Sequence, residues 1–327
     1  MCNHHNNQSA HESQKVVSTD QNVIDAAEFY KHRKVLVTGG AGFIGSHLVE
    51  ALVAAEADVT VLDNLSTGKK ENLETVWQKI CFIEGDIRSF KTCVAATAGQ
   101  DLVFHQAAFV SAPESIEKPY ECYEINVNGT LNLLNASHCT GTKKVVFASS
   151  AAVYGNTDAP CHEEQGCDPN SPYGVSKLAA EKYCQIYFQK YGLETICLRY
   201  FNVWGERQRA DLKYPGALAN FRDRIEKNLP ITIYGDGSQT RDFINVAAIV
   251  QANLKLARLP SDQLNGQSIN IASGTSKSLL EMIELLKASE PKYNLPISFE
   301  PARPGDIKSS AAINQKLQSL IDRFNLV

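Results

Sequence analysis

Residues 35–47 read VLVTGGAGFIGSH, and this stretch joins a strand, a glycine-rich turn and the start of an apolar helix. Its β-branched, apolar beginning is typical of a strand inside a parallel sheet. The glycines lack a Cβ where the backbone must approach other backbone or a phosphate, and the amides that open the helix can hold a pyrophosphate. The candidate dinucleotide ligands in this stretch are Gly39, Gly42, Phe43, Ile44 and Gly45.

An acidic residue after the next strand strengthens that interpretation. Residues 58–62 form a second apolar strand, and Asp63 follows it. This carboxylate lies about 20 residues beyond the glycines, where it can accept both ribose hydroxyls of an adenosine. A glycine triplet alone also occurs in structural turns, but strand, turn, helix, strand and acid in this order favour a dinucleotide site. Because Asp63 would repel a 2′-phosphate, we expect NAD rather than NADP, with Asn64 beside it.

The rest of the chain predicts an α/β fold. From residue 34 strands and helices alternate, which indicates a Rossmann-type, doubly wound parallel sheet with a smaller C-terminal α/β substrate-binding domain. The expected strands are residues 35–38, 59–62, 80–84, 102–105, 144–148 and 195–198. The expected helices are residues 45–55, 89–97, 121–138 and 172–191. The segment at residues 55–58 has no glycine to end its helix, so we expect a different cap there.

Three regions are expected along the chain. Residues 1–31 are polar, lack the apolar core of a secretory signal, and are interpreted as an N-terminal extension. Residues 32–200, with a further strand between 231 and 275, form the NAD-binding domain. Residues 201–327 form the substrate-binding lobe, interleaved with that domain.

Composition narrows the class of protein. The net charge of −4 over 327 residues gives no reason to expect nucleic acid or an anionic membrane as partner, and no apolar run is long enough to span a bilayer. The nine cysteines are an odd number without a CxxC pair. We therefore expect reduced thiols, a cytoplasmic location and no metal site.

Polar residues follow the predicted strands, at the edge where such sheets bind ligands. Asp86, with Ile87 after it, is placed to meet the adenine amino group, or equally to cap a helix. His105 at the end of the fourth strand is interpreted as a buried structural histidine. Asn126 interrupts an otherwise apolar helix and supports either the sheet or the site. The small residues after His105 allow a cofactor to approach closely, and the candidates there are Gln106, Ala107 and Ala108.

The residues for chemistry come after the fifth strand. Ser150 ends a serine-rich strand, and Tyr173 and Lys177 lie one turn apart on one face of a helix that begins at Pro172. A free phenol has a pKa near ~10, too high for a base at neutral pH. We expect the lysine charge and a cationic nicotinamide to lower that pKa, with Ser150 aligning the same substrate oxygen.

These motifs together resemble the extended short-chain dehydrogenases/reductases, and within them the nucleoside-diphosphate-sugar 4-epimerases. Residues 38–45 match the TGxxGxxG turn, residues 126–130 the NVxGT segment and residues 173–177 the YxxxK pair. The resemblance implies an NAD that stays bound through turnover. It also implies that Tyr173 takes the proton of the sugar 4-hydroxyl while the C4 hydride moves to NAD. The flat 4-keto sugar would then turn over and receive the hydride on its other face.

The residues after Ser150 help to choose the reaction. Related dehydratases and decarboxylases carry acidic residues there, whereas this chain has Ala151 and Ala152, which cannot transfer protons. These alanines therefore favour a reaction that oxidises, inverts and reduces the sugar, without an elimination or decarboxylation step. The alternatives are a UDP-glucuronate 4-epimerase, a nucleoside-diphosphate-sugar 4,6-dehydratase, or, from a different class, a non-catalytic regulator that senses NAD. The last of these has no need for Ser150, Tyr173 and Lys177 together.

The second half resembles the family's sugar-binding half. Residues 199–208 match its RYFNVxGxRQ stretch, which implies that Tyr200 and Val203 lie near the nicotinamide. The residues implied around the UDP-sugar are Ser111, Ser150, Asn202, Gln208, Tyr234, Arg241, Arg303, Asp306 and Ser310. Ser310 is small, which implies room for an N-acetyl group and hence UDP-GlcNAc and UDP-GalNAc, with UDP-glucose and UDP-galactose beside them. The alternative is an ordinary surface serine. We also expect a homodimer.

Overall fold

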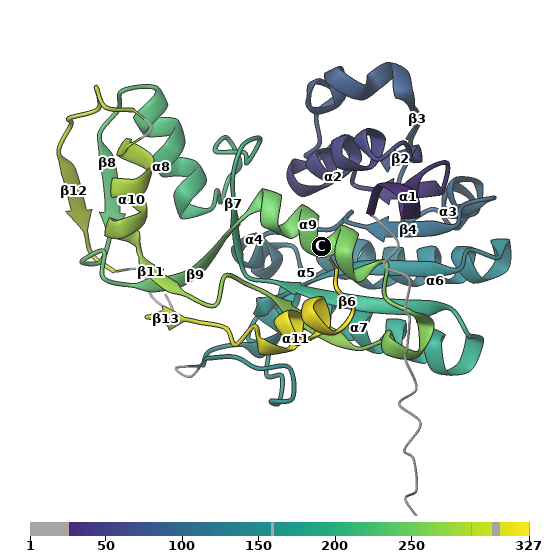
Figure 1. The fold of residues 1–327 in the computed structure, drawn as a ribbon. Coiled ribbons are helices and arrows are strands. Elements are labelled where there is room, and N and C mark those ends of the chain that lie inside the picture. Colours follow the sequence, from purple (N-terminus) through teal and green to yellow (C-terminus); the bar gives the residue numbers. More distant parts are fainter. Residues whose placement is uncertain (1–25, 158–159, 289, 303–307, 327) are drawn as a thin grey trace, which may run out of the picture.

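The computed structural model describes residues 26–157, 160–288, 290–302 and 308–326, and it contains one large parallel sheet (Figure 1). Seven strands lie in the order β10-β6-β5-β4-β1-β2-β3, and every neighbouring pair is parallel. Their bounds are β1 Lys34–Thr38, β2 Asp58–Asp63, β3 Ile80–Glu84, β4 Leu102–His105, β5 Lys144–Ser150, β6 Glu194–Tyr200 and β10 Ser268–Ile271. The Rossmann prediction is therefore confirmed.

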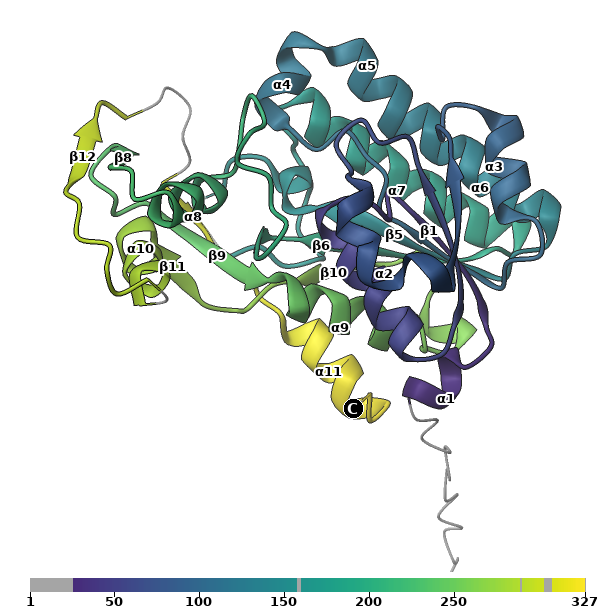
Figure 2. The ribbon, with the colours of Figure 1, turned by 90° about the horizontal axis from the view of Figure 1, so that it is seen from above.

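Helices cover both faces of this sheet (Figures 1 and 2). One face packs against α2 (Phe43–Ala54), α9 (Val246–Leu256) and α11 (Gln315–Arg323), and the other against α3 (Phe90–Thr97), α6 (Gly129–Thr140) and α7 (Pro172–Tyr191). The two apolar cores are separate, and the strands between them, apart from the edge strand β3, are buried on both sides. This explains why their sequences are continuously apolar rather than alternating.

The strand order reverses between β1 and β4, and this point positions the site. The chain runs outward from β1 to β2 and β3, then returns to β4 and continues the other way. Crossover connections therefore leave opposite faces at these two strands, and a crevice opens beyond their carboxyl ends. The glycine-rich turn follows β1 directly, so the sequence delivers it to this crevice.

A smaller lobe lies beside the sheet (Figure 1). Four short strands form one sheet: β7 (Asn202–Trp204), β9 (Thr240–Asn245), β11 (Ser276–Ser278) and β13 (Ser309–Ser310). A parallel pair, β8 (Ile231–Tyr234) and β12 (Ile297–Glu300), packs with α8 (Ala217–Glu226) and α10 (Leu279–Ala288) around a third apolar core. The predicted α/β lobe is present, and three of its strands, β7, β11 and β13, have only two or three residues.

One predicted helix is wrong in its form. Residues 121–138 are not continuous α-helix: α5 (Pro119–Tyr123) passes through a π-helical turn at Glu124–Asn128 into α6, and an unpredicted helix, α4 (Ala112–Glu117), precedes it. Hydrophobic periodicity does not distinguish an α-turn from a π-turn, because the difference is one residue of register. The π-turn contains Asn126.

Further short elements complete the chain. They are α1 (Ala26–Tyr30) and the 3₁₀ segments Lys70–Lys79, Ala151–Tyr154 and Ser261–Gln263. After α2 the expected different cap is Glu56, which takes the left-handed conformation (φ 57°) that glycine would normally supply. The last helix, α11, is short but present and packs against β10.

Candidate active site

The glycine-rich turn at the carboxyl end of β1 packs closely against neighbouring backbone and leaves helix amides without an acceptor. A Cβ built on Gly39 would lie 2.7 Å from the Ala107 nitrogen, and one on Gly45 would lie 2.1 Å from the Gly39 oxygen, so neither position admits another residue. Gly42 is the N-cap of α2 and supplies no side-chain acceptor to the first helical amides. These amides are therefore available to an anion, which fits the pyrophosphate of a dinucleotide.

Asp63 lies beside this turn. Its Oδ2 accepts the Ala41 N–H (2.9 Å) and its Oδ1 accepts the Leu65 N–H (2.8 Å), which fixes the carboxylate. Burial raises the pKa of Asp63, and these two hydrogen bonds oppose that effect. Each carboxylate oxygen retains a second lone pair, so the residue fits a pair of ribose hydroxyls.

Asp86 is not a helix cap. The N-cap of α3 is Ser89, whose hydroxyl accepts the Thr92 N–H, so that alternative is wrong. Instead Asp86 accepts two hydrogen bonds from the Arg88 guanidinium (3.0 and 2.8 Å) and one from Asn64 Nδ2 (2.8 Å). Hydrogen bonding from Arg88 lowers the pKa of Asp86 to about 2. Asn64 and Asp86 thus meet at the ends of β2 and β3, where an adenosine is expected, and Ile87 is buried beside them.

His105 is structural, as predicted. Its Nδ1 lies 2.8 Å from Thr38 Oγ1 and its Nε2 lies 3.0 Å from Thr130 Oγ1. Because the Thr130 hydroxyl donates to the Asn126 carbonyl (2.6 Å), we assign the ring proton to Nε2. Burial and the charge of Lys177 lower the pKa of His105 to about 3, so it is neutral.

Asn126 is buried and connects the loop after β4 to the beginning of α7. Its Oδ1 accepts the Phe109 N–H (2.8 Å), and its Nδ2 donates to the Phe109 carbonyl (3.0 Å) and to Ser176 Oγ (2.9 Å). Ser176 in turn donates to the Tyr173 carbonyl (2.7 Å). The π-turn therefore holds the loop after β4 against the first turn of α7.

Ser150, Tyr173 and Lys177 are brought together. The Ser150 hydroxyl lies close enough to the Tyr173 phenol to lower its pKa, and Lys177 Nζ lies 5.9 Å from the centre of the Tyr173 ring while donating to the Ala148 carbonyl (2.8 Å). Burial lowers the pKa of Lys177 to about 8. Burial also raises the pKa of Tyr173, although the neighbouring Ser150 hydroxyl opposes this. In the chain without cofactor, desolvation therefore dominates the pKa of Tyr173, and our expectation of a lowered phenol pKa concerns the enzyme with a cationic nicotinamide bound.

Two buried polar clusters under the site were not predicted. In the first, the Tyr200 hydroxyl lies 3.0 Å from Gln106 Nε2 and 3.0 Å from Asn253 Oδ1. In the second, Glu181 and Arg199 form a buried ion pair (2.7 Å). Further members of the second cluster are Ser149, Tyr154 and Asn270. For the second cluster the sequence does carry a signal, because Arg199 is a charged residue within a largely apolar strand. The sequence does not show that it pairs with Glu181.

The substrate-side residues are less closely assembled. Asn202 donates to the Asp242 carbonyl (3.1 Å), and Gln208 donates to the Val203 carbonyl (3.1 Å), so these residues join β7 to β9 and to the following segment. Ser310 pairs with Arg241 across β13 and β9. Ser111 caps α4 by accepting the Glu114 N–H. Tyr234 is part-exposed on β8, while Arg303 and Asp306 lie outside the described residues.

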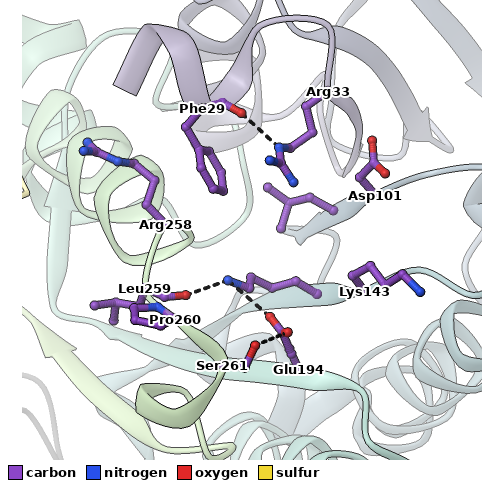
Figure 3. Close-up of a pocket in the computed structure, with 11 residues that line it drawn as sticks. Phe29, Arg33, Asp101, Lys143, Glu194, Arg258, Leu259, Pro260 and Ser261 are labelled. Carbon is purple, nitrogen blue, oxygen red and sulfur yellow. Dashed lines mark hydrogen bonds and ion pairs between the residues drawn. The ribbon is translucent and has the colours of Figure 1, made fainter. Parts of the chain in front are cut away.

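A cavity of about 280 Å³ lies at the opposite end of the sheet, below the amino ends of β1, β4, β5 and β6 (Figure 3). Lys144 in its wall donates to the Ala257 and Leu259 carbonyls (2.9 and 2.7 Å) and pairs with Glu194 (3.3 Å). These bonds tie β5 to the end of α9. We interpret the cavity as structural, because the candidate site residues lie at the carboxyl ends of the strands, away from it.

Two further findings concern only the part of the chain that the structure describes. None of its helices has the length and apolar character needed to cross a bilayer. Its histidine, cysteine and acidic side chains form no group of three that could hold a metal ion.

Comparison with known proteins defines the class. Residues 35–272 match the model of the NAD dependent epimerase/dehydratase family. The chain therefore belongs to this family, and its resemblance to the extended short-chain dehydrogenases/reductases is confirmed. It is an enzyme of the epimerase class with NAD as its cofactor, which agrees with the open amides and the fixed carboxylate at the carboxyl end of the sheet.

Individual relatives of this chain are UDP-sugar 4-epimerases, in agreement with the family match. The chain is similar to the UDP-glucose 4-epimerase of Mycolicibacterium smegmatis, with 34% identity over 293 residues that cover 88% of this chain and 92% of the relative. The solved UDP-N-acetylglucosamine 4-epimerase of Methanobrevibacter ruminantium, in complex with UDP-N-acetylmuramic acid, superposes with a TM-score of 0.82 at 36% identity, covering 89% and 92% of the two chains. The UDP-glucose 4-epimerase of Thermus thermophilus, in complex with NAD, gives a TM-score of 0.78 at 36% identity, covering 88% and 92%.

Proposed function

We propose that this enzyme inverts C4 of a UDP-hexose, most readily UDP-GlcNAc and UDP-GalNAc, and also UDP-glucose and UDP-galactose. The observation that carries the proposal is the contact of Ser150, Tyr173 and Lys177 beside a dinucleotide turn, with only alanines at positions 151 and 152. No acid or base for elimination follows Ser150, which favours inversion over dehydration.

Tyr173, Ser150 and Lys177 have different roles at the sugar 4-hydroxyl. Bound NAD supplies a hydride acceptor that becomes a donor in the second half of the cycle. Tyr173 takes the proton of the 4-hydroxyl and later returns it, and Ser150 holds the same oxygen through a hydrogen bond. Lys177 stabilises the phenolate, and its position is fixed by the Ala148 carbonyl.

We propose further that the domains divide as the sequence suggested. Residues 32–200 hold the cofactor together with α9, β10 and α11, which complete the large sheet and one of its faces, and the other residues from 201 onward hold the UDP-sugar. The pairing of Ser310 with Arg241 supports this, because it places a small side chain next to a cation that can hold a diphosphate. The proposed contacts from Asn202, Gln208, Tyr234, Arg303 and Asp306 belong to the same lobe.

The choice of sugar is tested at Ser310. We expect Ser310→Tyr to reduce kcat/KM for UDP-GlcNAc by about tenfold or more and to spare UDP-glucose, because a bulky side chain excludes only the larger C2 substituent. Both enzymes are incubated with a panel of UDP-sugars that includes UDP-glucuronate, and separation of the products gives the activity on each sugar. A dehydratase would be identified by its 4-keto-6-deoxy product. Ser309→Tyr on the same strand is the control. Equal losses of kcat/KM on both sugars would show that Ser310 does not determine which sugar is accepted.

We also propose that the enzyme is a homodimer. Helices α4, α5 and α7 contact one another and expose apolar side chains, namely Ile116, Tyr120, Tyr123, Val175 and Ile186, at 43–86% of their area. Helix faces of this kind bury themselves well against a second copy. We expect Tyr120→Glu with Ile186→Glu to give a monomer in sedimentation velocity. Leu229→Glu, on the smaller lobe, should leave the dimer intact, and a monomeric wild type would contradict the proposal.

A further inference from the structure

The segment between β7 and α8 crosses from one side of the dinucleotide crevice to the other. We call residues 205–216 the strap. It starts where β7 ends, between the smaller lobe and α2 (Figure 1), and it has no regular secondary structure. Its side chains bond to three elements that surround the crevice. Long loops without secondary structure commonly carry function, and these contacts indicate which one.

The first attachment is to α2, directly behind the glycine-rich turn. Arg207 donates to Glu50 Oε1 (2.7 Å) and to Ser46 Oγ (3.2 Å), and the Glu206 carbonyl lies 3.1 Å from His47 Nε2. Both members of the Arg207–Glu50 ion pair are about three-quarters buried, at 23% and 27% exposure. Such a charge-assisted bond is stronger than a fully exposed pair.

The backbone at this attachment is strained. Arg207 has φ of 63°, the left-handed conformation that side-chain-bearing residues rarely adopt. A residue stays in this conformation only when its surroundings hold it there. The bonds of its guanidinium to Ser46 and Glu50 are the contacts that do so, and they place the strap against α2.

The second and third attachments lie on the two sides of the crevice. Arg209 donates to the Thr67 carbonyl (3.0 Å), in the loop that folds back over Asp63. Lys213 Nζ pairs with Glu117 of α4 (2.5 Å), and the Tyr214 hydroxyl bonds to the same carboxylate. The strap therefore extends from the expected adenosine ribose, past the pyrophosphate turn, to the helix that follows β4.

We propose that the strap retains NAD, and that the Arg207–Glu50 pair fastens it. A dinucleotide held by the glycine-rich turn and Asp63 leaves the crevice only after the strap detaches from at least one of its attachments. An epimerase gains from this arrangement, because the reduced cofactor must remain in place until the hydride returns to the sugar. The inference concerns cofactor release and does not depend on which sugar is used.

The test is the rate of NAD release from the holoenzyme. Enzyme loaded with adenine-labelled NAD is diluted into excess unlabelled NAD, and the label that stays with the protein is followed over time. We expect Arg207→Glu and Glu50→Arg each to speed release by about tenfold, the cost of losing a charge-assisted bond. The double variant, which restores an opposite-charge pair, should return to within about threefold of the wild-type rate.

Arg222→Glu is the matched control, because it reverses an ion pair of the same length with Glu226 on α8, away from the crevice. It should leave release unchanged. If a reversal variant does not fold, Arg207→Met removes the charge while keeping the stem and should also speed release. Release from the single variants at the wild-type rate, or from the double variant as fast as from the singles, would overturn the proposal.

Discussion

The large sheet and the smaller lobe present their functional residues differently. On the sheet side, each key group is already held: Asp63 by two backbone amides, Lys177 by the Ala148 carbonyl, and Tyr200 by Gln106 and Asn253. On the lobe side, Ser310 lies on a strand of two residues and Tyr234 is 39% exposed. The half that we propose to hold the cofactor is therefore preorganised by the fold, while the half that we propose to hold the sugar presents a few side chains on short strands.

This contrast predicts different consequences of mutation. A change on the sheet side should affect every substrate equally, because all reactions share the cofactor and the base. A change on the lobe side should alter which sugar is accepted. The predictions that follow concern the sheet side, in order of decreasing effect, and the Ser310 variant provides the counterpart on the lobe.

The largest effect is expected at Tyr173. We expect Tyr173→Phe to lower kcat by about 10³-fold for every UDP-sugar, within the range of general acid–base catalysis, while NAD content and folding persist. Steady-state kinetics measure kcat, and the absorbance of the purified protein measures its NAD content. Tyr183→Phe on the same helix is the control and should stay close to wild type. A Tyr173→Phe enzyme that kept most of its activity would remove this residue as the base.

The next effect concerns cofactor choice. Asp63→Asn should improve NADP binding relative to NAD by about 10- to 100-fold, because a carboxylate repels a 2′-phosphate and an amide does not. Dissociation constants for both cofactors give the ratio, with Asp58→Asn at the exposed start of β2 as the control. Unchanged discrimination would mean that Asp63 does not face the ribose.

The smallest of these effects is on stability against pH. The pKa of Lys177 is about 8 in the folded protein and 10.5 when unperturbed, so above pH 8 the unfolded chain binds a proton that the folded chain has lost. Stability contributed by this residue should therefore rise with pH, by up to about 1.4 kcal/mol per unit between pH 8 and 10.

Urea unfolding at pH 8, 9 and 10 measures this slope. Lys177→Met removes the titrating group. The free energy of unfolding of the wild type, minus that of the variant, should therefore increase as pH rises. Subtracting the two curves cancels the buried tyrosines and cysteines, whose raised pKa values act in the opposite direction. Parallel curves would show that Lys177 is not desolvated as the structure indicates.

The sequence predicted the sheet and its carboxyl edge well, for a physical reason. Strand and turn signals are local, and parallel strands bring their carboxyl ends together whatever lies between them. Six strands were therefore expected within two residues of their observed bounds, and β10 only within a broad range. The meeting of Asn64 with Asp86, and of Ser150 with Tyr173, follows from the same geometry.

Features that depend on distant partners were missed. The π-turn contains Asn126, whose side chain bonds to Phe109 and Ser176, and local periodicity contains no trace of these bonds. Likewise, Asn253 meets Tyr200 from 53 residues away. The raised pKa of Tyr173 arises from burial, whose extent becomes visible only in the packed structure. The strap was overlooked because its contacts lie on α2, α4 and the loop after β2.

The central claim is that hydride leaves and returns to C4 of the same sugar on a retained NAD. Holoenzyme without added cofactor is incubated in ordinary water with UDP-GlcNAc that carries deuterium at C4, and the products are examined by NMR and mass spectrometry. The account predicts UDP-GalNAc that keeps its deuterium at C4 and no loss of water from the sugar. A product that has lost the deuterium to solvent, a dehydrated product, or inversion that requires added NAD in every cycle would contradict it.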